Sequence, residues 1–205
     1  MYLVKSPLLL KWYYPKLTWN KNRDQKVIYL TFDDGPIPDV TAFVLKTLKS
    51  FDAKATFFCI GDNIVKHPDI FEQIKREGHQ IGNHTFNHLK GWITEDQRYL
   101  NNFRQCQKLT GTNLFRPPYG RIKKSQILGI KALMPEMQLI MWDVLSGDFD
   151  PGLSPEKCYQ NVIRHTRNGS IIVFHDSLKA FDRLEYTLPR CLQYFKEMGF
   201  EFAVL

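Results

Sequence analysis

Two adjacent carboxylates, Asp33 and Asp34, follow the apolar run 27–30 and directly precede Gly35 and Pro36. The apolar run is typical of a buried strand, and Gly-Pro after it predicts a turn. In an ideal strand the two side chains would point to opposite faces, but at a turn both can reach one cavity. The stretch is therefore either an ordinary turn or a functional site where one carboxylate binds a metal and the other transfers a proton.

Two histidines, His84 and His88, stand four residues apart. On a helical turn, side chains at this spacing project from one face and can share one ion. A carboxylate from a neighbouring strand end would complete a set that suits Zn²⁺, with open positions for water and substrate. The alternatives are two polar histidines at the start of a helix, or a non-haem Fe(II) oxygenase, which typically has an all-β scaffold.

Strand-like runs alternate with helix-like segments along the chain. The expected strands are 27–32, 55–60, 80–83, 114–116, 138–142, 171–175 and 201–205. The expected helices are 40–50, 68–78, 94–109, 155–167 and 184–197, with Pro189 as an interruption of the last. Thr94 and Gln97 resemble a capping box, and Ser154 before Pro155 is typical of an N-cap. This alternation predicts a mostly parallel sheet, either a barrel or an open doubly wound sheet.

Ionisable residues gather just past the ends of the expected strands. They are Asp33 and Asp34, His84 and His88, Arg116 before Pro117-Pro118-Tyr119-Gly120, Asp143 and Asp148, and His175 and Asp176. In both candidate architectures, ligand sites form at the carboxyl ends of strands. Scattered surface charges would not all fall there, so the coincidence favours a functional site over a simple turn.

Composition indicates one ordinary globular domain. The chain has 205 residues, 43% of them hydrophobic and 24% charged, and a formal net charge of +7. Residues 1–26 hold six basic residues and one acid, which accounts for +5 of this charge. This basic arm also carries Trp12, Tyr13, Tyr14 and Trp19. It would pack on the domain or touch an anionic membrane surface, and both could be true, because Leu8–10 can dock while the lysines face outward.

The sequence has four widely separated cysteines, Cys59, Cys106, Cys158 and Cys191, and none forms a Cys-x-x-Cys pair. Free buried thiols are the favoured interpretation, with two disulfides left open. The longest apolar run near the N-terminus is far shorter than the roughly 20 residues of a membrane span. No export signal is evident, so we expect a cytoplasmic protein or one at the inner face of the membrane.

Five motifs together resemble the polysaccharide deacetylases, the nodulation-protein-B homology domain of carbohydrate esterase family 4. Thr-Phe-Asp-Asp-Gly-Pro stands at 31–36, His-Thr-x-x-His at 84–88 and Arg-Pro-Pro-Tyr-Gly at 116–120. The fourth motif, usually Asp-Ser-x-Asp-Trp, reads Leu-Ser-Gly-Asp-Phe at 145–149, and the fifth, Leu-x-His, reads Val-Phe-His at 173–175. The motifs span most of the chain but leave the arm outside.

The resemblance implies a role for each matching residue. Asp34, His84 and His88 would bind one divalent metal ion, Zn²⁺ by preference, which activates a water as the nucleophile. Asp33 would be the general base, and Arg116 would pair with it and keep it ionised.

The other matching residues would complete the site. His175 would be the general acid that protonates the leaving amine, held and tuned by Asp148. The Tyr119 N–H would help to bind the oxyanion. Phe149 and Val173 would line the pocket for the acetyl methyl. Both replace the usual residue but keep an apolar surface, so these departures bear on substrate preference rather than on the chemistry. Asp143 is either a neighbour of this site or a loop cap.

We therefore expect a distorted seven-stranded β/α barrel with a mostly parallel sheet, in which residues 27–205 form the catalytic domain behind the arm 1–26. The expected activity is a metal-dependent hydrolase of linear amides that removes N-acetyl groups from amino sugars of a polysaccharide or glycoconjugate. The alternatives are a non-catalytic carbohydrate-binding relative, a deacylase of a small non-sugar amide, and a basic surface-associated protein. We expect a monomer and no nucleic-acid partner, because no known nucleic-acid motif is present.

Overall fold

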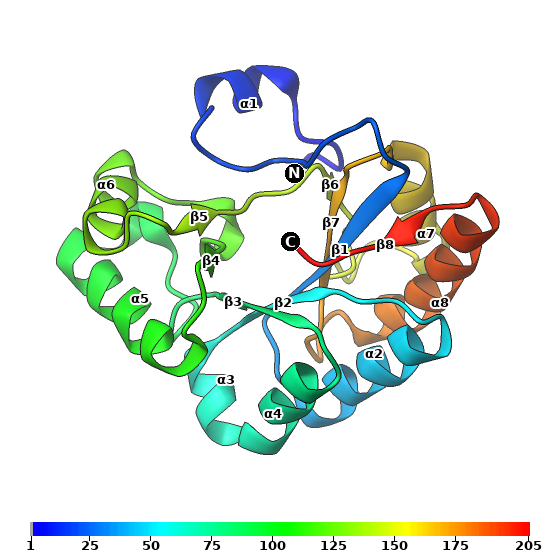
Figure 1. Ribbon diagram of the computed structural model, residues 1–205, viewed down its shortest axis with the longest axis horizontal. Helices are drawn as coiled ribbons and strands as arrows, with labels where there is room; N and C mark the ends of the chain where they lie inside the picture. Colours follow the sequence, from blue (N-terminus) through cyan, green and yellow to red (C-terminus); the bar gives the residue numbers. More distant parts are fainter. Residues whose placement is uncertain (1) are drawn as a thin grey trace.

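A curled, parallel β-sheet forms the centre of the molecule in the computed structural model, which describes residues 2–205 (Figure 1). The strand order is β5-β4-β3-β2-β1-β7-β6, and β8 pairs with β1 off this path. The strands are β1 (Val27–Asp33), β2 (Thr56–Cys59), β3 (Gln80–Asn83), β4 (Leu114–Phe115), β5 (Gln138–Leu139), β6 (Val144–Leu145), β7 (Ile171–His175) and β8 (Glu201–Phe202). The expected distorted barrel of seven strands is confirmed as a half-barrel that stays open between β5 and β6.

Helices cover the outer face of the sheet. They are α2 (Pro38–Ser50), α3 (Gly61–Lys66), α4 (Pro68–Arg76), α5 (Asp96–Thr110), α6 (Lys124–Leu133), α7 (Pro155–His165) and α8 (Phe181–Glu197), with the short turns η1 (Gly91–Ile93) and η2 (Pro118–Gly120). The expected helices are present, and Ser154 caps α7 as expected by accepting from Lys157 N–H. Pro189 lies inside α8 without interrupting it. The sequence did not indicate α3, α6 or β6. The helix α3 has six residues and β6 has two, while the ten-residue α6 leaves the apolar Leu128 exposed beside the buried Ile130, which weakens its periodicity.

The capping box expected at Thr94 is wrong. The N-cap of α5 is Glu95, whose carboxylate accepts from the N–H groups of Gln97 and Arg98 at 2.8 Å each. The Thr94 hydroxyl instead donates to the Lys90 carbonyl. A carboxylate at this end is also favoured by the helix dipole.

Successive side chains of β1 point alternately to the core and to the interior of the half-barrel. Ile28, Leu30 and Phe32 face outward, into the main core between the sheet and helices such as α2 and α8. The alternate residues, among them Thr31 and Asp33, therefore point into the half-barrel. Parallel strands with both faces covered read as continuous apolar runs, which is why the sequence showed no alternation here.

Residues 2–26 run along the open side of the half-barrel, where Figure 1 shows the helix α1 (Leu8–Tyr13) above the gap. Isolated bridges join the arm to both edges of the sheet, from Thr18 to Ile140 beside β5 and from Lys5 to Val144 in β6. Leu17 and Trp19 of this segment are buried and pack with the core under α5 and α6.

Asp143 fastens the arm. Its buried carboxylate accepts from Lys5 Nζ at 2.7 Å, Lys11 Nζ at 2.6 Å and Arg23 Nη2 at 3.0 Å. The Ser170 hydroxyl donates to the same carboxylate at 2.7 Å. Asp143 is therefore neither a contact of the candidate site nor a loop cap. The expected orientation of the arm is reversed, since lysines turn inward here and the leucines of α1 point outward.

Replacing Asp143 with asparagine is expected to lower the free energy of unfolding by roughly 2–3 kcal/mol at pH 7, because three cations lose their buried counter-charge. This figure is below that of a fully buried pair, since the cations keep some solvent access. Burial raises the pKa of Asp143, but the donors, led by Lys11 and Lys5, bring it well below its ordinary range. Because the pKa of Asp143 is lowered in the folded protein, its ionised carboxylate stabilises the fold above about pH 4, and this stabilisation is lost as the pH falls further. The effect of the variant should therefore shrink in acid. Urea unfolding at pH 7 and at a pH below 4 measures this difference, with the exposed Asp24→Asn as control. An equal loss of unfolding free energy at both pH values would contradict the prediction.

All four cysteines are free and buried, as expected. Among residues 2–205, none of the helices combines the length and the hydropathy that crossing a bilayer requires.

Candidate active site

Two neighbouring strands bring an acid and a histidine together. Asp33 is the last residue of β1, and its register partner in β7 is His175, also the last residue of its strand. Paired residues of parallel strands point to the same face, so both side chains lie at the carboxyl end of the half-barrel interior. The predicted gathering of ionisable residues at strand ends arises from this registration.

Arg116 is fully buried inside the half-barrel and holds Asp33. Its Nη1 donates to Asp33 Oδ1 at 2.6 Å and to Thr31 Oγ1 at 2.7 Å. The other guanidinium nitrogens donate to the carbonyls of Ile140 and Met141. The group is therefore bonded on all sides, and it fixes the Asp33 carboxylate in one orientation as an ion pair.

Asp34, His84 and His88 form a compact set of metal-ligating side chains. One donor atom from each lies within 4.8 Å of the others. Asp34 Oδ1 is 3.8 Å from His84 Nε2 and 3.3 Å from His88 Nε2. The histidine spacing predicted that the two imidazoles share a site with a strand-end carboxylate, and the family resemblance assigned Asp34 to it.

The surroundings of this set suit a cation. Asp34 Oδ1 is buried and has no hydrogen-bond donor among residues 2–205, which would be costly for a carboxylate oxygen without a ligand. His84 Nδ1 lies 2.8 Å from the Arg116 carbonyl, so it carries the proton and Nε2 keeps its lone pair toward the set. Burial lowers the pKa of both histidines, His84 most strongly, which keeps them neutral as metal ligands must be.

The loop 84–88 is not the helical turn that the spacing suggested. Thr85 and His88 have left-handed backbones, with φ of 63° and 55°. The Thr85 N–H donates to Asn83 Oδ1, and the N–H groups of Phe86 and Asn87 donate to Asn102 Oδ1. Side chains thus take the N–H groups of this segment, and the two imidazoles converge through a looped backbone.

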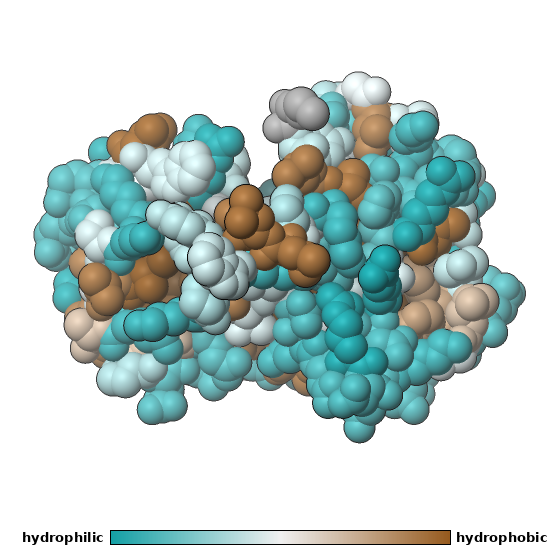
Figure 2. Space-filling model, turned by 90° about the horizontal axis from the view of Figure 1, so that it is seen from above, coloured by the Kyte–Doolittle hydropathy of each residue, from teal (hydrophilic) through white to brown (hydrophobic). Residues whose placement is uncertain are grey.

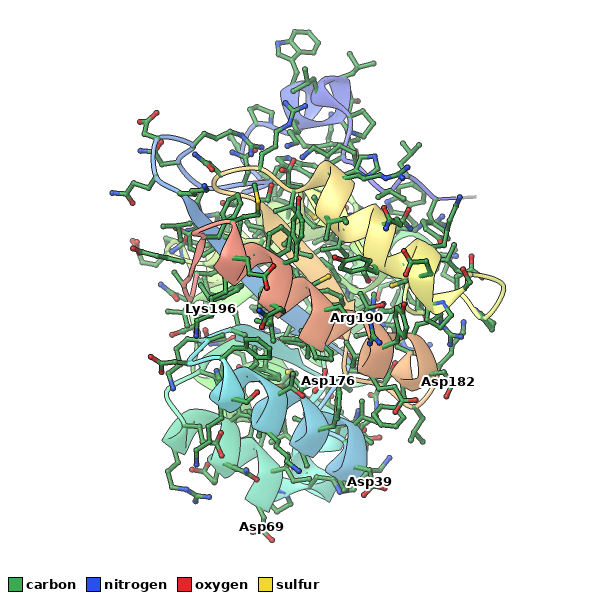
Figure 3. All side chains as sticks on the ribbon, turned by 90° about the vertical axis from the view of Figure 1, so that its right-hand side faces the viewer. Asp39, Asp69, Asp176, Asp182, Arg190 and Lys196 are labelled. Atoms are coloured by element: carbon green, nitrogen blue, oxygen red, sulfur yellow. The ribbon has the colours of Figure 1, made fainter. Side chains whose placement is uncertain are left out.

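Asp176 is a supporting residue to which the sequence gave no role. Its Oδ1 accepts from the Gly35 N–H at 2.9 Å, and its Oδ2 accepts from the Thr41 hydroxyl at 2.6 Å. Figure 3 shows Asp176 in the interior between α2 and α8. A Cβ at position 35 would lie 1.9 Å from Asp176 Oδ2, so only glycine allows this approach. Burial, together with the nearby Asp34 charge, raises the pKa of Asp176 to about 8 despite these two donors.

His175 is paired with Asp148. Asp148 Oδ1 lies 2.7 Å from His175 Nδ1, and Oδ2 accepts the His175 backbone N–H at 2.7 Å. Burial alone would lower the pKa of His175, but the Asp148 charge and hydrogen bond raise it to about 9. The imidazole is therefore protonated at neutral pH. Arg183, which the sequence did not single out, donates from Nε to the Asp148 carbonyl at 2.6 Å and holds this loop.

Aromatic side chains border the site. The Tyr119 ring lies 4.6 Å from that of His88, on a residue with φ of 59°. The Phe149 ring meets His175 edge-on at 5.2 Å, and it also lies 5.0 Å from the ring of Tyr2 in the arm. Tyr2 lies far from the motifs in sequence, so no pattern could have indicated that it lies next to Phe149. Val173, two residues before His175 on the same strand, is buried.

Comparison with known proteins identifies the family. The polysaccharide deacetylase family model matches residues 20–134, and the chain belongs to this family. It is 32% identical over 195 residues to a peptidoglycan-N-acetylglucosamine deacetylase of Bacillus cereus, covering 92% of this chain and 91% of the relative. It is 36% identical over 162 residues to a chitooligosaccharide deacetylase of Azorhizobium caulinodans, covering 75% of each.

A solved structure has the same fold over nearly the whole chain. It is a peptidoglycan N-acetylglucosamine deacetylase in complex with 4-naphthalen-1-yl-N-oxidanyl-benzamide, with a TM-score of 0.87 and 29% identity. The match covers 98% of this chain and 95% of that one. The arm therefore belongs to the shared structure, although it lies outside the five motifs.

Proposed function

We propose that this protein hydrolyses the N-acetyl group of amino sugars in a polysaccharide or glycoconjugate. The observation that carries this proposal is the arrangement of two hydrogen-bonded pairs, Asp33 with Arg116 and His175 with Asp148, beside the Asp34–His84–His88 set. Amide hydrolysis needs a base for water and an acid for the amine, and the two pairs offer a carboxylate for the first role and an imidazole for the second.

The group that we assign to Asp34, His84 and His88 is one divalent ion, Zn²⁺ by preference. Two imidazoles and one carboxylate are a common zinc set that leaves positions free. When bound, the ion supplies Lewis-acid polarisation of the acetamide carbonyl and lowers the pKa of water.

We assign the base role to Asp33. The Arg116 guanidinium forms an ion pair with this carboxylate and fixes its orientation, and we assign its free oxygen to the reacting water. As the water oxygen bonds to the acetamide carbon, Asp33 accepts the water proton. The Tyr119 N–H, in a loop fixed by Pro117 and Pro118, would donate to the oxygen that gains charge.

We assign the acid role to His175. Its proton passes to the amide nitrogen while the carbon–nitrogen bond breaks, so that acetate and a free amine leave. Asp148 stabilises the imidazolium before this transfer. Phe149 and Val173 would surround the acetyl methyl, and Tyr2 packs against Phe149.

The substrate that we propose contains N-acetylglucosamine, as do the named substrates of the Bacillus cereus relative and of the solved structure. Acetate release should be measured with peptidoglycan, chitooligosaccharides and a small acetamide, each with and without added Zn²⁺. Release from a glycan supports the proposal. Release from the small amide alone would indicate a non-sugar deacylase, and glycan binding without release would indicate a non-catalytic relative.

Replacing Asp148 with asparagine is expected to move the alkaline limb of the kcat/KM profile to lower pH by at least about one unit. The acid must be protonated, so activity falls as the pH rises through its pKa. Without Asp148, only the Asp34 and Asp33 charges still offset the lowering of the His175 pKa by burial. At pH 8 the loss should be about twofold if the pKa of the acid falls by one unit and about tenfold if it falls by two. The profile of the neighbouring Asp150→Asn serves as control. If the alkaline limb of the kcat/KM profile is the same in Asp148→Asn as in the wild type, the Asp148–His175 pair has no part in the mechanism.

A further inference from the structure

The helix α1 exposes an apolar face. Leu8 is 82% exposed, Leu9 74% and Trp12 78%, and no residue of α1 is buried. Figure 2, which looks down on this side of the molecule, shows hydrophobic residues gathered at the centre of the face. Single exposed leucines are ordinary, but neighbouring ones that share a short helix with an exposed tryptophan mark an interaction surface.

The structure holds this face outward. Before the helix, Ser6 N–H and Oγ donate to the carbonyls of Asp143 and Trp142. Within the helix, Lys11 reaches back to the buried Asp143 carboxylate. After it, Trp19 Nε1 donates to the Tyr14 carbonyl. Ser6 and Lys11 tie the polar side of the helix to Trp142 and Asp143 beside the sheet edge, and the Trp19–Tyr14 bond fixes the chain after the helix, so the apolar side chains point outward.

The charges around the face favour an anionic partner. Residues 1–23 contain no acidic residue. Lys16 is exposed next to the helix, and Lys124, also exposed, lies 3.3 Å from the Tyr13 hydroxyl and over its ring. A second copy of this surface would bring like charges together. An anionic lipid surface would match both the apolar tip and the lysines, and Trp and Tyr are the side chains favoured at its boundary.

We propose that α1 docks the protein on a membrane containing anionic phospholipid, with Leu8, Leu9 and Trp12 inserted at the interface. The helix has six residues and lies on the bilayer rather than across it. Apolar insertion drives this contact and the lysines select the lipid. The inward-turned Lys5, Lys11 and Arg23 take no part in it.

The test is flotation of the full chain with vesicles of phosphatidylcholine alone or mixed with phosphatidylglycerol. The wild type should float with the mixed vesicles, and salt above about 0.15 M should weaken but not abolish this, because apolar insertion is not screened. The double variant Leu8→Ser, Trp12→Ser should bind at least about tenfold more weakly. The matched control is Val65→Ser, an exposed apolar residue of α3 on the opposite side of the molecule.

Acetate release from a soluble substrate should be the same in all three proteins, which keeps this test separate from that of the active site. Two results would overturn the proposal: the double variant floats like the wild type, or the wild type binds neither kind of vesicle. A dimer in gel filtration that the double variant dissociates, without vesicle binding, would assign the face to a second copy instead.

Discussion

Replacing His84 with alanine should remove the bound metal and lower turnover by about 10³-fold or more. A metal that polarises a carbonyl contributes several kcal/mol to transition-state stabilisation, and each 1.36 kcal/mol is a factor of ten. His84 is the most constrained of the three ligands, since it is buried and its Nδ1 is held by the Arg116 carbonyl. Its loss leaves only Asp34 and His88, too few to hold a zinc ion firmly.

The measurement is metal content by mass spectrometry after dialysis against a chelator and reloading with Zn²⁺, together with acetate release. Because a buried alanine can disturb folding, His88→Ala, at the partly exposed ligand, is a second variant with the same expected result. His67→Ala is the matched control, since that imidazole makes no cap hydrogen bond to α4 and lies outside the set. Full activity of His84→Ala after chelation would refute the metal site.

Replacing Asp33 with asparagine should cost roughly 10²- to 10⁴-fold in kcat while the metal stays bound. Asparagine keeps the shape of the side chain but cannot accept the water proton. The three metal ligands are untouched, so this variant separates proton transfer from metal binding. Turnover near that of the wild type with intact metal would exclude Asp33 as the base.

In Asp33→Asn the buried Arg116 also loses its counter-charge. This loss should lower the free energy of unfolding by at most several kcal/mol. The remaining bonds of Arg116 to Thr31 and two carbonyls limit that cost. Thermal unfolding of Asp33→Asn should therefore accompany the kinetics, with exposed Asp39→Asn on α2 as control (Figure 3). A folded, metal-loaded and slow enzyme is the expected result.

The local sequence was sufficient for most of the elements and for proposing which residues belong to the site. Apolar runs and helix caps predicted most strands and helices, because burial and capping act over a few residues. The first three motifs placed Asp33, Asp34, His84, His88 and Arg116 together, since parallel strands carry their ends to one edge. The two-residue strand β6 had too little pattern to be recognised.

Only the tertiary structure decided how distant residues support that site. Gly35 accommodates the Asp176 carboxylate, Arg183 bonds to the loop of Asp148, and Tyr2 lies against Phe149, each across a long stretch of chain. The same holds for the arm: composition revealed its charge, but not that Asp143 would draw three of its cations inward and leave the leucines exposed. A buried carboxylate must find counter-charges, and which cations meet it depends on the fold rather than on their neighbours in sequence.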